Sequence, residues 1–513
     1  MDVLHLTVEA IAIATGASSL SGRWKMLSHS LHANTRRIDL AGRTLIPGFN
    51  DAHVHLWKVG MLLTIMLDAR QAAAPNITAI IAAFKARADQ TSAGQWITGR
   101  GYNNVTLADG RHPTRHDLDQ ASTQHPIVLI HTSAHTYACN SLALQLAGIT
   151  RDTADPDGGH LERDEHGEPT GVLHETAMNA INKVQPPPTD EEFEGALIAA
   201  AKYYLRMGVT SITEAGVSPA QLDVYRKMAD DRRMPIRANV MARRYLDDGT
   251  KVPLPERYEG NWMRIDTVKL FADGGLSAGN AALSVNYRDR SDAGLLRSTS
   301  DQMRAMIWDI HRAGLRAAVH AVGDAAIEQV IEAIEFASRR LVSRMKHRIE
   351  HFGLPNADHL RRCRGRISVV PQPVFIHALG STFLKYIPDE LMPRLYPLRS
   401  IIDAGLTVAL SSDAPVVPDP NPLLALQAAA MRRAEDGTTI HAEQSIPVTL
   451  ALPLHTLGGA VVAGEDHLKG AILPGKFADL AVLSGDPLRA PVERLTDLRV
   501  EMTMVDGHIL YGG

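Results

Sequence analysis

The chain has 513 residues, a hydrophobic fraction of 45% and a formal net charge of −4. This length allows two to four domains, or one large barrel with insertions and a small companion domain. The charges form no basic stripe, which argues against nucleic acid as a partner, and no apolar run approaches the roughly 18 residues that span a membrane.

Cysteine content and the N-terminus indicate the compartment. Two cysteines, Cys139 and Cys363, cannot form a disulfide framework, which favours a reducing environment. The chain begins Met1-Asp2 with no basic segment before residues 10–20, unlike a signal peptide. We therefore expect a soluble cytoplasmic protein.

The first part of the chain contains short elements. β-like segments are predicted at residues 8–13 and 37–40. Residues 48–190 begin with a histidine-rich strand and continue as an irregular stretch, in which one helix (77–88) and one strand (127–131) are predicted.

Helices and strands then alternate from residue 191 to residue 440. Counted from the histidine-rich strand, the predicted strands end at His55, Thr213, Met241, Phe271, His320, His351, Val370 and Leu410. Such alternation implies parallel strands joined by right-handed crossovers, and eight strand–helix units close a barrel. The sequence therefore predicts an α/β fold with a TIM-like (β/α)8 barrel.

The two chain ends are predicted to form one small domain, because β-like segments return after residue 450. We expect residues 1–47 and 451–513 to pair as a small β-sandwich domain beside a barrel of residues 48–450. Residues at about 60–190 form an insertion after strand one, which we expect to fold over the active site.

Side chains that can bind metals lie at or near the downstream ends of the predicted strands. They are His53, His55, Lys269, His320, His351 and Asp413. In an α/β barrel these strand ends converge where active sites are built. His53 and His55 are two residues apart, so both point the same way from a strand and can bind one ion. The set predicts a metal-dependent hydrolase, and surface histidines in a loop are the alternative for the pair.

Lys269 lies in an apolar strand, where burial disfavours the protonated amine. A neutral amine can add carbon dioxide, and the resulting carbamate has two oxygens that can bridge two cations. An ion pair with Asp273, which shares the strand parity of Lys269, is the alternative.

Asp413 follows the eighth strand, where a carboxylate can bind a metal and accept a proton from bound water. An Asx turn before Pro415 is the alternative. His347 has the same parity as His351 but lies four residues deeper in its strand, so we expect a structural role for it.

Five motifs resemble those of the amidohydrolase superfamily, and the chain is most similar to the YtcJ-like group, which includes N-substituted formamide deformylase. They are Gly-Phe-Asn-Asp-Ala-His-Val-His (48–55), Val-Lys-Leu-Phe-Ala-Asp-Gly-Gly (268–275), Val-His-Ala-Val-Gly-Asp (319–324), Arg-Ile-Glu-His (348–351) and Ser-Ser-Asp-Ala (411–414). The motifs occur in order, and the resemblance covers almost the whole chain. It is specific for fold and reaction class but not for substrate.

The resemblance implies a binuclear metal centre. His53 and His55, with Asp413, would hold the more buried ion, His320 and His351 the second, and a carboxylated Lys269 would bridge them. Two zinc ions suit these ligands, with manganese, iron or nickel as alternatives. A bound metal lowers the pKa of water to about 7, and the hydroxide that forms would attack an amide or formamide carbonyl. Asp413 would act as general base and then as general acid.

The substrate is expected to be a small molecule with a non-peptide carbon–nitrogen bond. Substrate contacts are expected from Tyr102, Asn103, His135, Gln372 and His377, and a structural role is the alternative for each. A lactonase, esterase or deaminase with the same metals, or an inactive scaffold, are the alternative functions. No glycine-rich phosphate loop is found, so nucleotide use is not expected.

Two expectations concern assembly and the N-terminus. A homodimer is the assembly that we consider. The chain begins almost at Val8-Glu9-Ala10, where relatives in the group usually carry a further β hairpin, so either the small domain is abbreviated or the protein starts upstream.

Overall fold

The structure is a computed structural model that describes residues 10–14, 17–22, 35–132, 136–156, 158–246, 249–343 and 345–513. The chain forms two compact units. The first consists of Met1–Leu56, Ala201–Arg244 and Val252–Gly513, and the second of Trp57–Ala200 and Tyr245–Lys251. No helix in the described ranges has the length and apolar character needed to cross a membrane.

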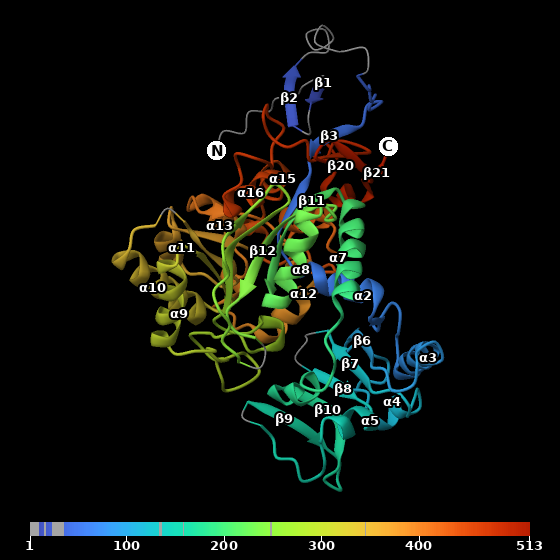
Figure 1. Cartoon of the computed structure of the whole chain (residues 1–513). Coiled ribbons are helices and arrows are strands. Elements are labelled where there is room, and N and C mark those ends of the chain that lie inside the picture. The colour runs from blue at the N-terminus through green and yellow to red at the C-terminus, as the bar shows by residue number, and fades with distance from the viewer. Residues whose placement is uncertain are drawn as a thin grey trace. The chain divides into compact units, whose positions relative to one another are not determined.

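A parallel sheet forms the centre of the first unit (Figure 1). Its strands in chain order are β4 (Phe49–Val54), β11 (Val209–Val217), β12 (Arg237–Arg243), β14 (Met263–Phe271), β15 (Arg316–Ala321), β16 (His347–His351), β17 (Ile367–Val370) and β18 (Thr407–Val408). Each strand pairs with the next one in parallel, and the short β13 (Tyr258–Glu259) adds an antiparallel pair to β14. These are the eight strands that the sequence predicts.

Main-chain hydrogen bonds connect the first strand to the segment after the eighth. The amide of Asp413 donates to the carbonyl of His53 at 2.8 Å, and the amide of His55 donates to the carbonyl of Ala414 at 2.9 Å. Parallel strands that curl until the first meets the last form a TIM-like barrel. The predicted α/β barrel is therefore confirmed.

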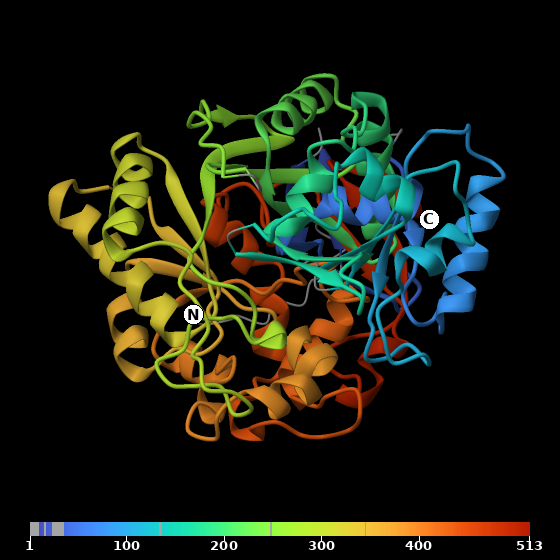
Figure 2. The same ribbon diagram turned by 90° about the horizontal axis from the view of Figure 1, so that it is seen from below.

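Helices follow the strands and cover the sheet, and Figure 2 shows the yellow helices α9 and α10 on the outer side of their strands. The helices from residue 190 onward are α7 (Asp190–Leu205), α8 (Pro219–Asp230), α9 (Ser300–Arg312), α10 (Asp324–Arg340), α11 (Ala357–Cys363), α12 (Val374–Tyr386), α13 (Leu398–Asp403), α14 (Pro422–Met431), α15 (Val448–Leu454) and α16 (Leu457–Ala463). Local sequence defines several helix starts. Ser218 and Gln221 form a capping box at α8, with Pro219 in the first turn.

Strands from both chain ends form a four-stranded antiparallel sheet in the same unit. Its order is β21 (His508–Gly512), β20 (Val500–Val505), β19 (Leu480–Leu483) and β3 (Thr44–Pro47). A separate hairpin pairs β1 (Ala10–Ala14) with β2 (Ala17–Gly22). In this sheet β3, from the N-terminal part of the chain, pairs with β19 near the C-terminal end.

The strand predicted at residues 37–40 is wrong, because this segment is irregular. Asp39 accepts a hydrogen bond from the amide of Ala41, and Ala41 and Gly42 have φ angles of 49° and 82°. These left-handed residues make a turn, and the strand starts only at Thr44.

The second unit contains a mixed sheet with the strand order β5-β6-β7-β8-β10-β9. The strands are β5 (Leu67–Asp68), β6 (Ile97–Tyr102), β7 (Ile127–His131), β8 (Thr136–Cys139), β9 (Gly159–Arg163) and β10 (Pro169–Glu175), and the helices are α2 (Leu56–Thr64), α3 (Ile77–Ala88), α4 (Arg115–Asp119), α5 (Ser141–Leu146) and α6 (Asn179–Asn182). Apolar clusters around Phe84 and around Leu144 form its core. The insertion is thus a folded unit with its own sheet.

Candidate metal centre

Three of the predicted ligands converge where the first strand meets the segment after the eighth. His53 is fully buried at the end of β4, and His55 follows it. The Oδ1 atom of Asp413 lies 3.4 Å from Nε2 of His53 and 3.6 Å from Nε2 of His55. The hydrogen bond from the backbone amide of Asp413 to the carbonyl of His53 holds these side chains close to one another.

The spacing of these atoms fits a divalent ion. Two ligand atoms on a tetrahedral ion are about 3.4 Å apart, because each metal–ligand bond is about 2.0–2.2 Å long. Ligand atoms of His53, His351 and Asp413 also lie within 4.8 Å of one another. The three side chains are buried. A buried set of imidazole and carboxylate donors at this spacing suits zinc and related ions.

Lys269 lies inside the same cluster. Its Nζ atom is 3.4 Å from Nε2 of His53, and the residue is only 2% exposed. Asp273, the alternative partner, accepts hydrogen bonds from the amides of Val322 and Gly323, at 3.1 and 2.8 Å. The position of the amine beside His53 favours the role of a metal-site ligand.

His320 and His351 form the other side of the cluster, with ring centroids 4.4 Å apart. Burial lowers the pKa of both imidazoles well below the usual value, and nearby positive groups, including Lys269, lower them further. Neutral imidazole is the form that binds a cation. His320 contacts the carbonyl of Gly274 through Nε2, and His351 contacts Gln372 through Nδ1, so in each ring the second nitrogen is left for a metal.

A carboxylate that the sequence analysis did not single out supports His53. Oε2 of Glu350, on β16, hydrogen-bonds Nδ1 of His53. Arg348 binds both carboxylate oxygens of Glu350, at 2.6 and 2.9 Å, and donates to the carbonyl of Ala52 at 2.7 Å. A carboxylate on the far nitrogen of a metal-binding histidine sets its tautomer and orientation. The sequence signal for this role is the oppositely charged pair Arg348 and Glu350, which stand two residues apart in a buried strand.

The side chain of Asp51, on β4, is hydrogen-bonded to the segment after the eighth strand. Its carboxylate accepts hydrogen bonds from the amide and the hydroxyl of Ser412, at 3.0 and 2.5 Å. Burial raises the pKa of Asp51 to about 6 despite these bonds. Nearby, His351 and Asp413 have φ angles of 71° and 57°, in the left-handed region. This backbone conformation is strained for non-glycine residues, and such strain is found most often at functional sites.

The predicted substrate contacts are spread over both units. Gln372 is fully buried and links His351 to Ser411, since its Nε2 atom donates to Oγ of Ser411 at 2.9 Å. His377, on α12, is half-buried and contacts the carbonyl of Arg433 at 3.3 Å. Gln372 is therefore placed to orient a candidate ligand.

The other three predicted contacts belong to the second unit. Tyr102 is buried and hydrogen-bonds Nδ1 of His112 at 2.9 Å. The side chain of Asn103 accepts from the amide of Val105 at 3.0 Å, within a turn. His135 lies outside the described residues. Substrate contact stays a prediction for all three.

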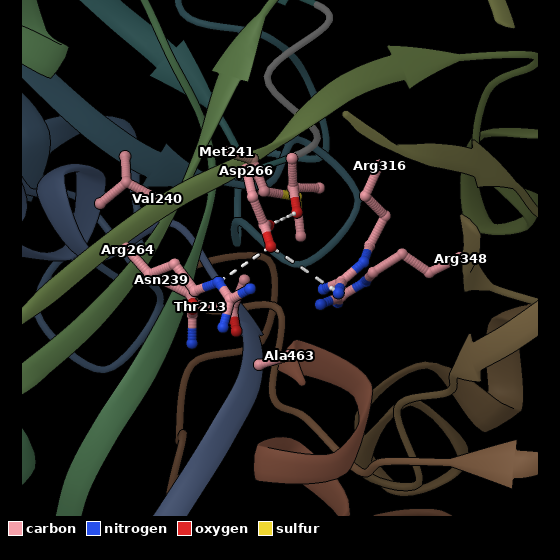
Figure 3. Close-up of a pocket in the computed structure, with 10 residues that line it drawn as sticks. Thr213, Asn239, Val240, Met241, Arg264, Asp266, Arg316, Arg348 and Ala463 are labelled. Atoms are coloured by element: carbon pink, nitrogen blue, oxygen red, sulfur yellow. Dashed lines mark hydrogen bonds and ion pairs between the residues drawn. The ribbon is translucent and has the colours of Figure 1, made fainter. Parts of the chain in front are cut away.

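A further polar cluster lies at the opposite, N-terminal ends of the barrel strands (Figure 3). Asp266 accepts from Arg264 at 2.8 Å and from Thr267 at 2.6 Å, and lies 3.8 Å from Arg316. The space between these side chains is too narrow for a water-sized sphere. Residues at the N-terminal end of a barrel contribute to stability, whereas the chemistry takes place at the opposite end. We therefore interpret this cluster as a packed ion network and not as a substrate site.

Comparison with known proteins identifies the class of this chain. The model of the amidohydrolase family matches residues 36–511. The chain belongs to this family, as its motifs predict. It is a hydrolase of the amidohydrolase superfamily with a TIM-like barrel.

Two relatives place the chain within the family. It is 30% identical to the Bacillus subtilis protein YtcJ, named as an amidohydrolase, over 98% of this chain and 96% of the relative. It is 25% identical to the N-substituted formamide deformylase of Arthrobacter pascens, over 100% of this chain and 96% of the relative. The predicted resemblance to this group is confirmed.

A solved structure shares the fold. An uncharacterised metal-dependent hydrolase from Pyrococcus horikoshii superposes with a TM-score of 0.79 at 24% identity, covering 94% of this chain and 95% of the other. This likeness supports the barrel assignment.

Proposed function

We propose that the chain is a metal-dependent amidohydrolase that hydrolyses a non-peptide carbon–nitrogen bond, of the amide or N-substituted formamide type. The observation that carries this proposal is the convergence of His53, His55 and Asp413 at the spacing of ligands on one ion. The name of the Arthrobacter pascens relative supports the bond type.

The ligands fall into two proposed sets. His53 and His55, with Asp413, hold one divalent ion, and His320 with His351 holds a second. A bound ion supplies a water that ionises near neutral pH and a positive charge that polarises the substrate carbonyl. Zinc suits the imidazole and carboxylate donors.

Lys269 is proposed to bridge the two sets after carboxylation. Its neutral amine forms a new nitrogen–carbon bond to carbon dioxide and releases one proton, which converts a neutral group into an anion with two oxygens. A buried amine 3.4 Å from His53 supports this role, because a protonated amine there would repel cations.

Asp413 is proposed to move the proton. Its carboxylate takes the proton of the attacking water and delivers it to the leaving nitrogen, as general base and then general acid. Glu350 and Gln372 keep His53 and His351 in the orientation that the site needs.

Metal analysis and a substrate screen test this function. We expect up to two divalent ions at the barrel centre of each chain, and removal by a chelator should abolish activity. A preparation active with less than about a tenth of an equivalent of any metal would refute metal dependence. The screen should contain formamides, N-acyl amino acids, lactones and aminated heterocycles. Release of an amine with an acid supports the proposal, whereas ammonia release or lactone opening as the main activity indicates another reaction.

Four finer expectations stay predictions. They concern the β-sandwich nature of the small domain, the placement of the insertion over the active site, the cytoplasmic location and the homodimer.

A further inference from the structure

A second group of histidines lies on one face of the sheet in the second unit. Its members are His112, His131, His160 and His174. His174 of β10 is directly opposite His160 of β9 on one side and Thr136 of β8 on the other. Tyr102 of β6 is paired with His131 of β7 in the same sheet. Because paired residues on adjacent strands point to the same face, the imidazoles form a row across the sheet.

His112, from the loop before α4, joins the two halves of this row. Its ring centroid is 5.9 Å from that of His131 and 5.9 Å from that of His174. The rings of His160 and His174 are 6.0 Å apart. Two imidazoles on one tetrahedral ion have centroids about 5 Å apart, because each metal–nitrogen bond is about 2 Å long. The spacings between these rings exceed this value by about 1 Å, so the rings would have to move toward one another around an ion.

The hydrogen bonds of these histidines leave the same nitrogen for a ligand. Nδ1 of His112 contacts the hydroxyl of Tyr102 at 2.9 Å, and Nδ1 of His160 contacts Asp155 at 2.7 Å. Nδ1 of His174 contacts the hydroxyl of Thr136 at 3.1 Å. In metal-binding histidines one ring nitrogen is held by such a partner, and the other binds the ion. Here Nε2 is that atom in all three rings.

A carboxylate completes the set of donors. Glu162 lies two residues after His160 on β9, so both side chains point to the same face. Its Oε2 atom is 3.9 Å from Nε2 of His174. The side chains of His174 and Glu162 are 30% and 42% exposed, which leaves a path from solvent.

The protonation state favours metal binding at neutral pH. Partial burial lowers the pKa of His112 and of His174. The nearby His174 lowers the pKa of His112 further, and His160 does the same for His174. Both imidazoles are therefore neutral near pH 7, and a metal need not displace protons from them.

We propose that His112, His174 and Glu162, with His160 as a further ligand, form a binding site for a divalent transition-metal ion. The site is made only from residues of the second unit and shares no residue with the candidate metal centre of the barrel. Imidazole and carboxylate donors select Zn²⁺, Co²⁺, Ni²⁺ or Cu²⁺ over Ca²⁺ or Mg²⁺. A bound ion ties the loop that carries His112 to the β9–β10 hairpin.

Zinc stoichiometry of the full-length protein tests this proposal. The chelator-stripped protein and the variant His112→Gln/His174→Gln are dialysed against Zn²⁺, and bound metal is measured. We expect the variant to bind about one equivalent of zinc less than the unaltered protein. His166→Gln is the matched control, because His166 lies in the same hairpin with its side chain 77% exposed. Equal zinc content in the variant and the unaltered protein overturns the proposal.

A measurement on the unaltered protein covers the case in which the double variant does not fold. Diethyl pyrocarbonate modifies exposed neutral imidazoles, and the modified residues are identified by mass spectrometry with and without Zn²⁺. We expect zinc to protect His112 and His174 but not His166. Modification of all three to the same extent in both conditions overturns the proposal. Since barrel histidines are scored separately, failure here leaves the barrel metal centre untouched.

Discussion

The carboxylate of Glu350 hydrogen-bonds Nδ1 of His53, although 297 residues separate them in the chain. His53 can therefore present only Nε2 to the cluster of candidate ligands. The negative charge of Glu350, held by Arg348, also raises the basicity of the imidazole. This contact makes Glu350 a positioning residue for the candidate metal centre.

We expect Glu350→Gln to weaken metal binding by about 10- to 100-fold, the usual effect of losing such a partner. The amide keeps the shape but loses the charge, and it leaves Arg348 without its ion pair. Competition with a chelator of known affinity measures the effect. Glu335→Gln is the control, because Glu335 pairs with Arg362 on helical segments. Unaltered affinity in Glu350→Gln would show that the contact does not tune His53.

Lys269→Ala removes the proposed bridging anion and should abolish activity. Short carboxylates such as acetate or formate should restore part of it, since they supply two oxygens in the space that the side chain leaves. Chloride at the same ionic strength is the control, and turnover against carboxylate concentration is the measurement. A fully active Lys269→Ala enzyme would instead favour the ion pair with Asp273.

Asp413→Asn separates proton transfer from metal binding. The amide keeps an oxygen ligand but cannot hold the proton, so kcat should fall by a factor on the order of 10² to 10⁴ while most metal stays bound. Metal content and kcat of the same preparation are compared, with Asp419→Asn in the exposed part of the same loop as control. Near-normal turnover with bound metal would assign the proton to another residue, such as His377.

Acid should destabilise the protein through His347. Burial, together with the charge of His311, lowers the pKa of His347 to about 3 in the folded protein, against about 6.5 for an unfolded chain. Between these values the unfolded chain binds more protons, so the stability contributed above pH 6.5 is lost as the pH falls toward 3.

Denaturant unfolding between pH 7.5 and pH 5 measures this loss. His347→Gln should remove up to about a tenfold change in the unfolding equilibrium constant per pH unit below pH 6.5. His508→Gln, at an exposed position, should leave the pH dependence as it is. Parallel pH profiles for His347→Gln and the unaltered protein would contradict the prediction.

The barrel could be predicted from the sequence because short segments of the chain specify its strands and helices. Buried parallel strands are largely apolar runs, such as residues 316–321, and several are followed by a helix with capping residues, as Ser218 and Gln221 show at α8. The histidines that end such runs are recognisable without coordinates. The pattern of residues 37–40 also favours a strand, because the apolar Ile38 and Leu40 alternate with the polar Arg37 and Asp39.

The second unit could not be predicted in the same way. Its β6 contains Gly99, Arg100 and Gly101, and its β9–β10 hairpin is polar, so neither matches a simple strand pattern. Gly101 adopts φ 104°, which only glycine tolerates well. The contact between Glu350 and His53 also escapes sequence reasoning, because it depends on two distant strands meeting in space.

The contact between the first strand and the segment after the eighth strand has a consequence for synthesis of the protein. Asp51 and Ser412, which are hydrogen-bonded across this contact, are separated by 361 residues. At about 5–20 residues per second, a ribosome needs roughly 20–70 seconds to make that stretch. During this time the emerging chain carries His53 and His55 without Asp413. The full set of candidate metal ligands therefore exists only after the ribosome has made the chain as far as Asp413.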